Sequence, residues 1–171
     1  AIGNTAYIRR RPKGGIQIDT TTCSVTGHRD RPASKINTVK YSLYREIQAA
    51  IADGYTRFIS GFADGSDLLF AAIVAEEKQH NPALSLEAAI PYRGRMQTPN
   101  REFQRLLLVC DRVTVIRESY IPSCYMERNR YMVDHSQRVI AVYDGRKYGG
   151  TFSTIRYASA IGRDVRSIWV R

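Results

Sequence analysis

Residues 56–67 read TRFISGFADGSD, a short strand pattern that runs through a glycine-rich turn into a predicted helix. Residues 56–60 include the β-branched and aromatic side chains typical of a strand, which Gly61 and Gly65 then bring to an end. Residues 68–75 are apolar on every side, and the alanines among them favour a buried helix. A strand that leads directly into a helix is the repeating unit of parallel α/β sheets.

The same alternation extends along the chain in both directions. We expect Ser34 to cap the first helix, Pro91 to close the third strand and Pro99 to lie in the first turn of a helix that begins at Thr98. Short apolar strands without polar alternation belong in a sheet that helices cover on both faces, so the sequence predicts a parallel α/β sandwich. The predicted strands are residues 20–26, 56–60, 84–90, 112–116, 138–143 and 165–170, with helices over 34–53, 66–79, 125–135 and 151–161 and another from 98.

The length of 171 residues corresponds to one domain with a short extension. Residues 1–19 carry three consecutive arginines and a lysine before a Gly-Gly break, which predicts a basic arm or an edge hairpin, and residues 20–171 form the predicted domain. The longest apolar run is eight residues, against about 20 for a membrane-spanning helix, so we expect no membrane partner. No secretory signal pattern is visible, and the three cysteines, with no close pair among them, indicate free thiols in the cytoplasm.

The balance of charges points to an anionic partner. Lysine and arginine total 26 against 16 acidic residues, a formal net charge of +10. Arginine contributes much of this excess, and its planar guanidinium binds phosphate through two hydrogen bonds. Charge alone leaves open nucleic acid, a small phosphorylated ligand, or simply a well-solvated surface. No metal site is expected, because Cys124 and His135 have no further ligands at suitable spacing.

Right-handed crossovers place every strand-to-helix loop along one rim of the sheet, where α/β proteins bind ligands. After the first strand, Gly27 lets the backbone approach a ligand, His28 offers a hydrogen bond and Arg29 a clamp for an anion. After the second, the glycine-rich turn exposes backbone N–H groups at a helix start, which favours phosphate. Asp67 fits there as a cap or as an acceptor for a ribose hydroxyl or a base, since a carboxylate repels phosphate. The turn matches neither the Walker nor the dinucleotide fingerprint.

The loop after residues 138–143 offers a second cradle. Asp144 is followed by Gly149, Gly150 and Thr151 at another helix start, where a hydroxyl joins the exposed backbone. Residues 127–129, Glu-Arg-Asn, precede the fifth strand on a predicted helix, and intrahelical ion pairs are the alternative explanation for their charges. A serine triad is set aside, because the sequence has no Gly-x-Ser-x-Gly turn.

Taken in order, these motifs resemble the YpsA-like family of the SLOG superfamily, which also contains the Smf/DprA proteins and the LOG phosphoribohydrolases. The resemblance covers about residues 22–170 and implies a single Rossmann-like three-layer α/β/α sandwich with a mainly parallel sheet of about six strands, of bacterial or phage origin. It makes residues 20–171 a SLOG-like, Rossmann-type nucleotide-binding domain. The candidate ligand-binding residues are Gly27, His28, Arg29, Ser60, Gly61, Ala63, Asp64, Gly65, Asp67, Arg128, Asn129, Asp144, Gly149, Gly150 and Thr151.

The resemblance implies binding or sensing of a nucleotide or nucleotide-derived ligand, with no cofactor required. LOG enzymes follow their glycine-rich loop with a glutamate that takes part in glycosidic cleavage, but residues 149–156 hold no carboxylate, so we expect no turnover. A phosphoribohydrolase-like N-glycosidase acting on nucleoside monophosphates is one alternative. DprA-like nucleic-acid binding through the basic surface and abundant tyrosines is another, and homo-oligomerisation is left open.

Overall fold

The computed structural model describes residues 21–29 and 33–170. The predicted basic arm at residues 1–19 lies outside this part of the chain. No helix in the described part is long and apolar enough to span a membrane. The same part contains no cluster of three or more histidine, cysteine, aspartate or glutamate side chains able to hold a metal ion.

Six strands form one sheet, in the order β4-β3-β2-β1-β5-β6, and every neighbouring pair is parallel. This arrangement confirms the predicted α/β fold and its parallel sheet. From β1 the chain adds β2, β3 and β4 in turn on one side, and it then returns to add β5 and β6 on the other side of β1. The connections that follow β1 and β5 therefore run toward opposite edges of the sheet. The strands are β1 (Thr22–Gly27), β2 (Arg57–Ser60), β3 (Ser85–Tyr92), β4 (Arg112–Arg117), β5 (Arg138–Tyr143) and β6 (Asp164–Trp169).

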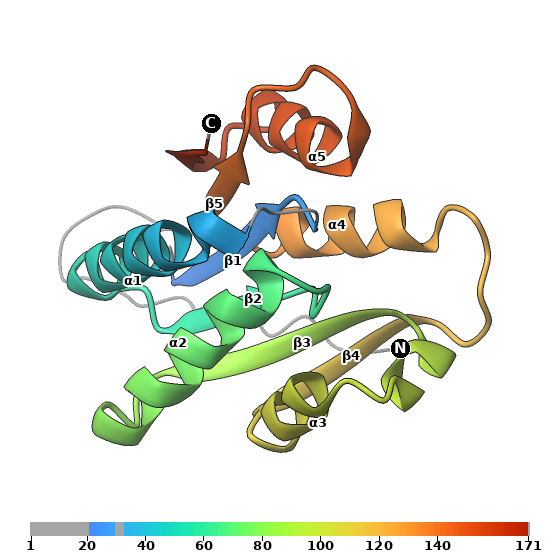
Figure 1. Cartoon of the computed structure of the whole chain (residues 1–171), viewed down its shortest axis with the longest axis horizontal. Helices are drawn as coiled ribbons and strands as arrows, with labels where there is room; N and C mark the ends of the chain where they lie inside the picture. Colours follow the sequence, from blue (N-terminus) through green and yellow to red (C-terminus); the bar gives the residue numbers. More distant parts are fainter. Residues whose placement is uncertain (1–20, 30–32, 171) are drawn as a thin grey trace, which may run out of the picture.

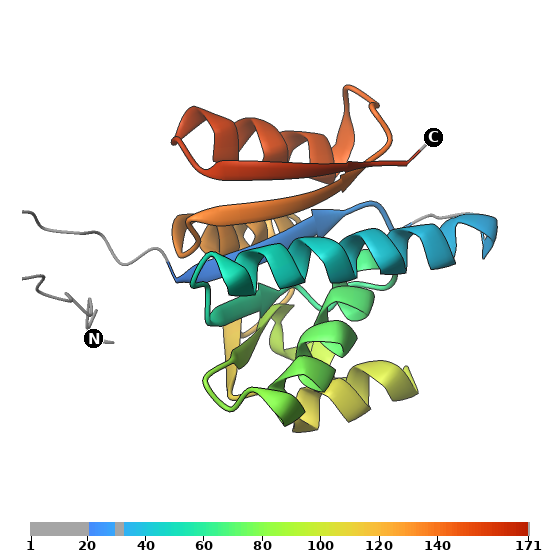
Figure 2. The same ribbon diagram turned by 90° about the vertical axis from the view of Figure 1, so that its left-hand side faces the viewer.

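Five α-helices cover the two faces of the sheet. Three follow one another along one face and two along the other, giving the three-layer sandwich of Figures 1 and 2. The first face carries α1 (Ile36–Ala52), α2 (Ser66–His80) and α3 (Arg101–Leu108), and the second carries α4 (Cys124–Asp134) and α5 (Gly149–Ala160). Two short 3-10 turns, η1 (Ala33–Lys35) and η2 (Arg93–Gln97), precede α1 and α3.

Several predicted boundaries differ from the observed ones; α5, for example, begins at Gly149 and not at Thr151. Ser34 lies inside η1 and does not cap α1, whose N-terminal position Lys35 makes no side-chain capping bond. Strand β3 continues through Pro91, because β2 ends opposite Ala88 and leaves β3 with a neighbour on one side only, a position that proline tolerates. Helix α3 begins after Asn100, whose side chain accepts a hydrogen bond from the backbone N–H of Phe103 at 3.1 Å.

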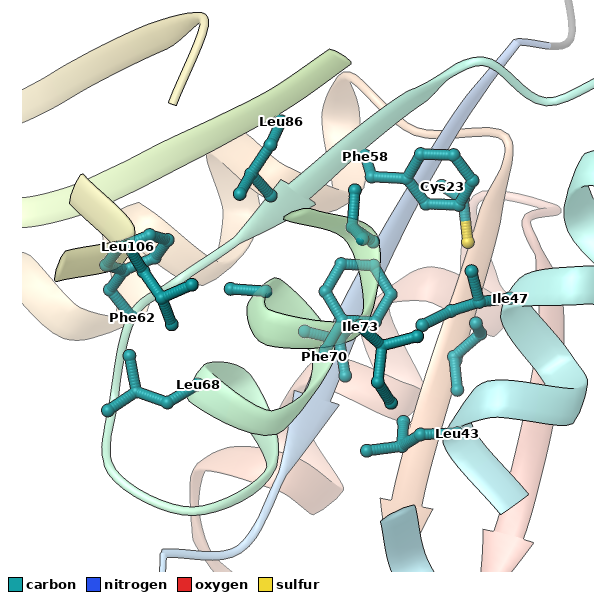
Figure 3. Packing of buried hydrophobic residues seen from close by; sticks show 14 of the residues in the cluster. Cys23, Leu43, Ile47, Phe58, Phe62, Leu68, Phe70, Ile73, Leu86 and Leu106 are labelled. Carbon is teal, nitrogen blue, oxygen red and sulfur yellow. The ribbon is translucent and has the colours of Figure 1, made fainter. Parts of the chain in front are cut away.

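The main hydrophobic core lies between the sheet and the first three helices (Figure 3). Phe58 on β2 and Phe70 on α2 meet there with ring centroids 6.0 Å apart, and Ile47 and Leu43 of α1 close the same cluster. A smaller cluster of Val133, Val139 and Ala158 fixes α4 and α5 to the other face. Because helices are anchored on both faces, the loops at the carboxyl ends of the strands are held in fixed positions.

Candidate ligand-binding site

The site lies at the carboxyl ends of β1 and β5, where the strand connections reverse direction. Such a switch point opens a crevice in α/β sheets, because the loops after the two strands diverge to opposite faces. The crevice here has a volume of about 330 Å³. Its walls come from three strand-to-helix loops and from the first turns of α4 and α5, and its lining residues are Val25, Thr26, Gly27, His28, Arg29, Ala63, Asp67, Tyr125, Arg128, Asn129, Arg146, Gly149, Gly150 and Thr151.

Most of the residues predicted from the sequence meet in this one crevice. The predicted residues that line it are Gly27, His28, Arg29, Ala63, Asp67, Arg128, Asn129, Gly149, Gly150 and Thr151. They come from four segments that are far apart along the chain, and the parallel topology brings them together. Five predicted residues lie outside the lining: Ser60, Gly61, Asp64, Gly65 and Asp144.

Arg128 is the most deeply placed charge of the site. It projects from α4, is only 4% exposed, and donates from Nη1 to the carbonyl oxygen of Gly61 at 2.5 Å. Its Nε donates to Asn129 Oδ1 at 2.9 Å, which fixes the amide beside it. Burial lowers the pKa of the guanidinium, and the nearby carboxylate of Asp67 opposes that shift. The side chain is therefore held in one orientation at the base of the crevice.

Arg29 and Tyr125 lie in contact with each other in the lining of the crevice. The guanidinium carbon of Arg29 lies 4.8 Å from the centroid of the Tyr125 ring, and that of Arg128 lies 5.7 Å from the same ring. The tyrosine is thus in cation–π range of both arginines, and its ring keeps two like charges near one another. Arg29 is exposed, so its guanidinium is accessible to a molecule that enters the crevice.

The loop after β5 holds a third arginine in place. Asp144 accepts from Arg146 Nε at 2.8 Å and from its backbone N–H at 3.0 Å, and its carboxylate also lies 3.0 Å from His28 Nε2. These interactions, chiefly the hydrogen bond from Arg146, lower the pKa of Asp144 to about 2. The His28 ring stacks on Tyr143 with centroids 5.9 Å apart. Asp144 therefore positions His28 and Arg146 from behind the lining and does not face the crevice.

Two glycines at the site have different surroundings. A Cβ on Gly27 would lie 2.7 Å from Ser66 Oγ and 2.8 Å from Ser66 Cβ, so only glycine lets the end of β1 pack on the start of α2. A Cβ on Gly150 would meet nothing nearer than Asn129 Nδ2 at 3.9 Å, because the space beside it is the crevice. Gly27 is therefore required by the fold, whereas Gly150 leaves room for whatever binds.

The loop between β2 and α2 divides its residues between fold and crevice. Phe62 has a positive φ of 55°, and its buried ring packs edge-on against that of Phe103, with the ring centroids 5.3 Å apart. The next residue, Ala63, lines the crevice. Ser60 is fully buried; its hydroxyl donates to the carbonyl of Asp67 at 2.8 Å and accepts from the N–H of Phe62. The Ser60 hydroxyl and the N–H groups of Phe62 and Ala63 are therefore engaged within the loop itself.

The remaining outlying residues of this loop also have structural contacts. Asp64 accepts from Asn100 at 3.1 Å and faces α3, away from the crevice. Gly65 has φ +88° and lies against the backbone of residues 28 and 29. Asp67 does not cap α2 as expected, because it is the second residue of the helix; its carboxylate accepts from the N–H of Ala63 at 3.2 Å.

The sequence reasoning missed four lining residues, namely Val25, Thr26, Tyr125 and Arg146. Thr26 and Arg146 stood inside motifs whose neighbours were chosen, and the signal for Arg146 was its place between Asp144 and Gly149. Tyr125 had no local signal, because only the packing of α4 brings it beside Arg29. Among the residues that the structure describes, the lining then holds three arginines against the carboxylate of Asp67, an excess of positive charge suited to an anion.

Comparison with known proteins identifies the family. The sequence model named YpsA, described as the YspA SLOG family, matches residues 25–163. The chain belongs to the YspA SLOG family. An uncharacterized SPbeta prophage-derived protein, YoqJ, of Bacillus subtilis (strain 168) is 30% identical over 118 residues, which cover 60% of this chain and 68% of YoqJ. A UPF0398 protein of Ligilactobacillus salivarius (strain UCC118) is 28% identical over 123 residues, covering 68% of this chain and 67% of that protein.

Two solved structures share the fold of this YspA SLOG member. DNA processing protein A from Helicobacter pylori superposes with a TM-score of 0.61 at 17% identity, covering 89% of this chain and 66% of that one. That protein binds single-stranded DNA. The structure of TM1055 gives a TM-score of 0.57 at 17% identity, covering 85% of this chain and 72% of the other. Likeness at this level of identity establishes the architecture alone.

Proposed function

We propose that this chain binds a nucleotide or a nucleotide-derived ligand in the crevice, with an anionic group between the arginines. One observation carries the proposal: Arg29, Arg128 and Arg146 converge on a single crevice at the switch point of the sheet. Charge-assisted bonds from guanidinium groups are among the strongest that phosphate accepts, and a partly buried setting strengthens them. The SLOG membership of the chain supports the same class of ligand.

A nucleotide suits the crevice better than a bare anion does. Asp67 and Thr151 also line it, and a carboxylate and a hydroxyl offer hydrogen bonds to sugar hydroxyls, which inorganic phosphate lacks. The carboxylate of Asp67 would repel phosphate at short range, so the anionic group is expected nearer to Arg29 and Arg146. The crevice volume of about 330 Å³ lies at the lower end of the usual range for small-molecule sites, about 300–1,000 Å³.

We further propose that the bound ligand is not turned over. Cleavage of an N-glycosidic bond requires a carboxylate or an equivalent group placed to stabilise an oxocarbenium-like transition state or to activate water. Among the described lining residues the carboxylate is Asp67, which already accepts from Ala63 and lies near buried Arg128. Incubation with nucleoside monophosphates, followed by chromatography, tests this point: release of free base above the uncatalysed control contradicts it and favours an N-glycosidase.

The binding proposal is tested by calorimetry on matched variants. Native mass spectrometry of freshly purified protein first reveals a co-purified adduct of nucleotide size, and a thermal-shift panel of nucleotides supplies ligands if none co-purifies. Arg29→Ala then removes one charge-assisted contact, for which about 1.5–3 kcal/mol is typical; because Arg29 is exposed we expect the lower end, about a tenfold loss of affinity. Arg57→Ala, an exposed arginine at the opposite end of the sheet, is the control. Equal losses in both variants, or none in either, contradict the proposal.

Single-stranded DNA is a second candidate ligand, favoured by a row of tyrosines that leads out of the crevice. The ring of Tyr125 lies 6.3 Å from that of Tyr92, which in turn lies 5.4 Å from the exposed ring of Tyr120. Stacking on such rings contributes to single-strand binding without sequence preference. Tyr120→Ala should weaken oligonucleotide binding while Tyr41→Ala, on exposed α1, should not.

Salt dependence separates this second candidate from the first. If three arginines contact phosphates of a single strand, affinity should fall about 20-fold between 50 and 200 mM salt, following a slope of about −0.7 per contact. A DNA affinity that barely changes over this range contradicts phosphate-driven binding. We propose a cytoplasmic location, because the three cysteines are free, as is usual in a reducing compartment. We also propose that binding requires no metal or cofactor. Its oligomeric state is open to measurement by native mass spectrometry.

A further inference from the structure

A second cavity adjoins the crevice, between the starts of α4 and α5. It has a volume of about 410 Å³, and we refer to it as the α4–α5 compartment. Tyr125, Asn129 and Gly150 line both the compartment and the crevice, so the two spaces share a wall with no other element between them. The remaining lining residues are Pro122, Met126, Arg130, Ser153, Thr154 and Tyr157.

The two spaces differ in chemistry. The crevice is lined by three arginines and by loop backbone, whereas the compartment presents the Met126 thioether, the Tyr157 ring and proline. Met126 is 53% exposed although it is apolar, and it lies on the same turn of α4 as Asn129. An apolar, partly aromatic space beside a cationic one suits a molecule with a planar ring at one end and a negative charge at the other.

The aromatic wall is fixed in place. The Tyr157 hydroxyl donates to Asp134 Oδ1 at 2.5 Å, and the guanidinium carbon of Arg130 lies 4.9 Å from the ring centroid. The hydroxyl of Thr154 donates to the carbonyl oxygen of Gly150 at 2.8 Å, so this polar group is already paired within α5. A ring that is already ordered loses little rotamer freedom when a second ring packs on it.

Two polar groups in the compartment could form hydrogen bonds with the edge of a bound ring. Asn129 Oδ1 is engaged by Arg128 Nε at 2.9 Å, so its amide NH₂ is directed by that bond and lies at the boundary with Gly150. The hydroxyl of exposed Ser153 is on the opposite helix. An amide and a hydroxyl on two sides of an apolar space are the donors and acceptors that read the edges of nucleobases.

We infer that the α4–α5 compartment binds the nucleobase of a nucleotide whose phosphate lies among Arg29, Arg128 and Arg146. This inference rests on the proposed function and sharpens it, because it makes the ligand a nucleoside phosphate and not a sugar phosphate or a bare anion. Arg130 is placed beside the Tyr157 ring, where it adds a planar cation to the stacking surface. The base is thus the part of the ligand that gives selectivity, and the phosphate the part that all related ligands share.

The test compares ligands that differ only in the base. Binding of ribose 5-phosphate and of the adenosine, guanosine, cytidine and uridine 5′-monophosphates is measured by calorimetry. Base stacking supports a gain of about ten- to hundredfold, so at least one nucleotide should bind that much more tightly than ribose 5-phosphate. Ser153→Trp fills the compartment and Met126→Ala removes one of its walls. Each should lower this ratio toward one and leave the ribose 5-phosphate affinity unchanged.

The control is Ser159→Trp, which places the same indole on an exposed position of α5 outside the compartment. It should bind all five ligands as the parent chain does. A base-dependent ratio that stays at the parental value in both Ser153→Trp and Met126→Ala overturns the inference, as does a parent chain that binds ribose 5-phosphate and the nucleotides equally. If the parent chain binds none of these ligands, the proposed function itself fails, which is a different result from equal binding.

Discussion

Replacing Gly61 by alanine tests whether the base of the crevice is as tightly built as its geometry indicates. The new Cβ would lie 2.7 Å from Arg128 Nη1 and 2.8 Å from both Arg128 Cζ and Asp67 Oδ2. Real Cβ atoms do not approach other atoms so closely, and both side chains are nearly buried, at 4% and 7% exposure. The guanidinium must therefore move, although it is held by the Gly61 carbonyl and by Asn129.

The size of the effect follows from how the chain relaxes. If the neighbours shift by a few tenths of an ångström, overpacking costs about 1–3 kcal/mol. If instead Arg128 is expelled, Asp67 and the Gly61 carbonyl lose a buried partner, and breaking such a pair costs about 3–5 kcal/mol. The less costly route decides, so we expect a loss of about 1–3 kcal/mol in the free energy of unfolding. In a chain of this length each kcal/mol lowers Tm by about 2–4 °C.

The assay is denaturant unfolding of a double-mutant cycle. Gly61→Ala is made alone and together with Arg128→Met, which removes the guanidinium while keeping a flexible side chain. If the clash is with Arg128, the penalty for Gly61→Ala should shrink by about 1 kcal/mol or more in the double variant. Penalties that add within about 0.5 kcal/mol refute this reasoning, as does a Gly61→Ala variant that unfolds at the same denaturant midpoint as the parent.

Three further predictions concern the walls of the site and the thiols. Gly150→Ala should leave Tm unchanged or slightly raised, since its Cβ meets nothing within 3.9 Å and alanine favours helix, yet calorimetry should show weaker ligand binding because the methyl occupies the crevice. Asp144 has a folded-state pKa of about 2, below the ordinary 3.8. Its contribution to stability is therefore present above about pH 4 and is lost as the pH falls toward 2. The difference in Tm between pH 6 and pH 3 should be smaller in Asp144→Asn than in the parent chain. Burial raises the pKa of Cys110 to about 12, which leaves little reactive thiolate at pH 8. Peptide mapping after iodoacetamide treatment at pH 8 should therefore show much slower alkylation of Cys110 in the folded chain than in the urea-unfolded chain. Equal rates would contradict the burial.

The strands were predictable because their signal is local. Residues 138–143 were predicted as a strand with the bounds that β5 has, since the five residues from Val139 to Tyr143 form an uninterrupted apolar and aromatic run typical of a buried strand. The convergence of Gly27 and Thr151 was also predictable, because parallel topology sends every strand-to-helix loop to one rim. What failed at the boundaries was turn chemistry: Asn100 caps α3 although Pro99 precedes it, and an isolated motif does not reveal which of two adjacent residues makes the capping bond.

Within the site, the sequence identified the correct loops but not which residues of each loop line the crevice. Ala63 and Asp64 are neighbours, yet one lines the crevice and the other bonds to Asn100 on α3. We attribute this to Phe62, whose positive φ turns the chain between Gly61 and Ala63. The motif does not predict a left-handed backbone conformation at a phenylalanine, because bulky residues rarely adopt it. Tyr125 escaped for a different reason, because its place beside Arg29 depends on how far α4 extends over the second face of the sheet.

The three arginines of the crevice differ in the work each can do for a ligand. Arg128 has already lost most of its hydration in the folded chain, as its lowered pKa indicates, so an arriving anion does not have to desolvate it again. Arg146 is ordered by its bonds to Asp144, and ordering it costs a ligand little. Arg29 is exposed, and its charge is screened by salt and steers the approach of an anion more than it holds one. A ligand that contacts all three should therefore associate at a salt-dependent rate. It should dissociate at a rate set mainly by the two ordered arginines, Arg128 and Arg146, so that substituting exposed Arg29 and substituting an ordered arginine alter different kinetic constants.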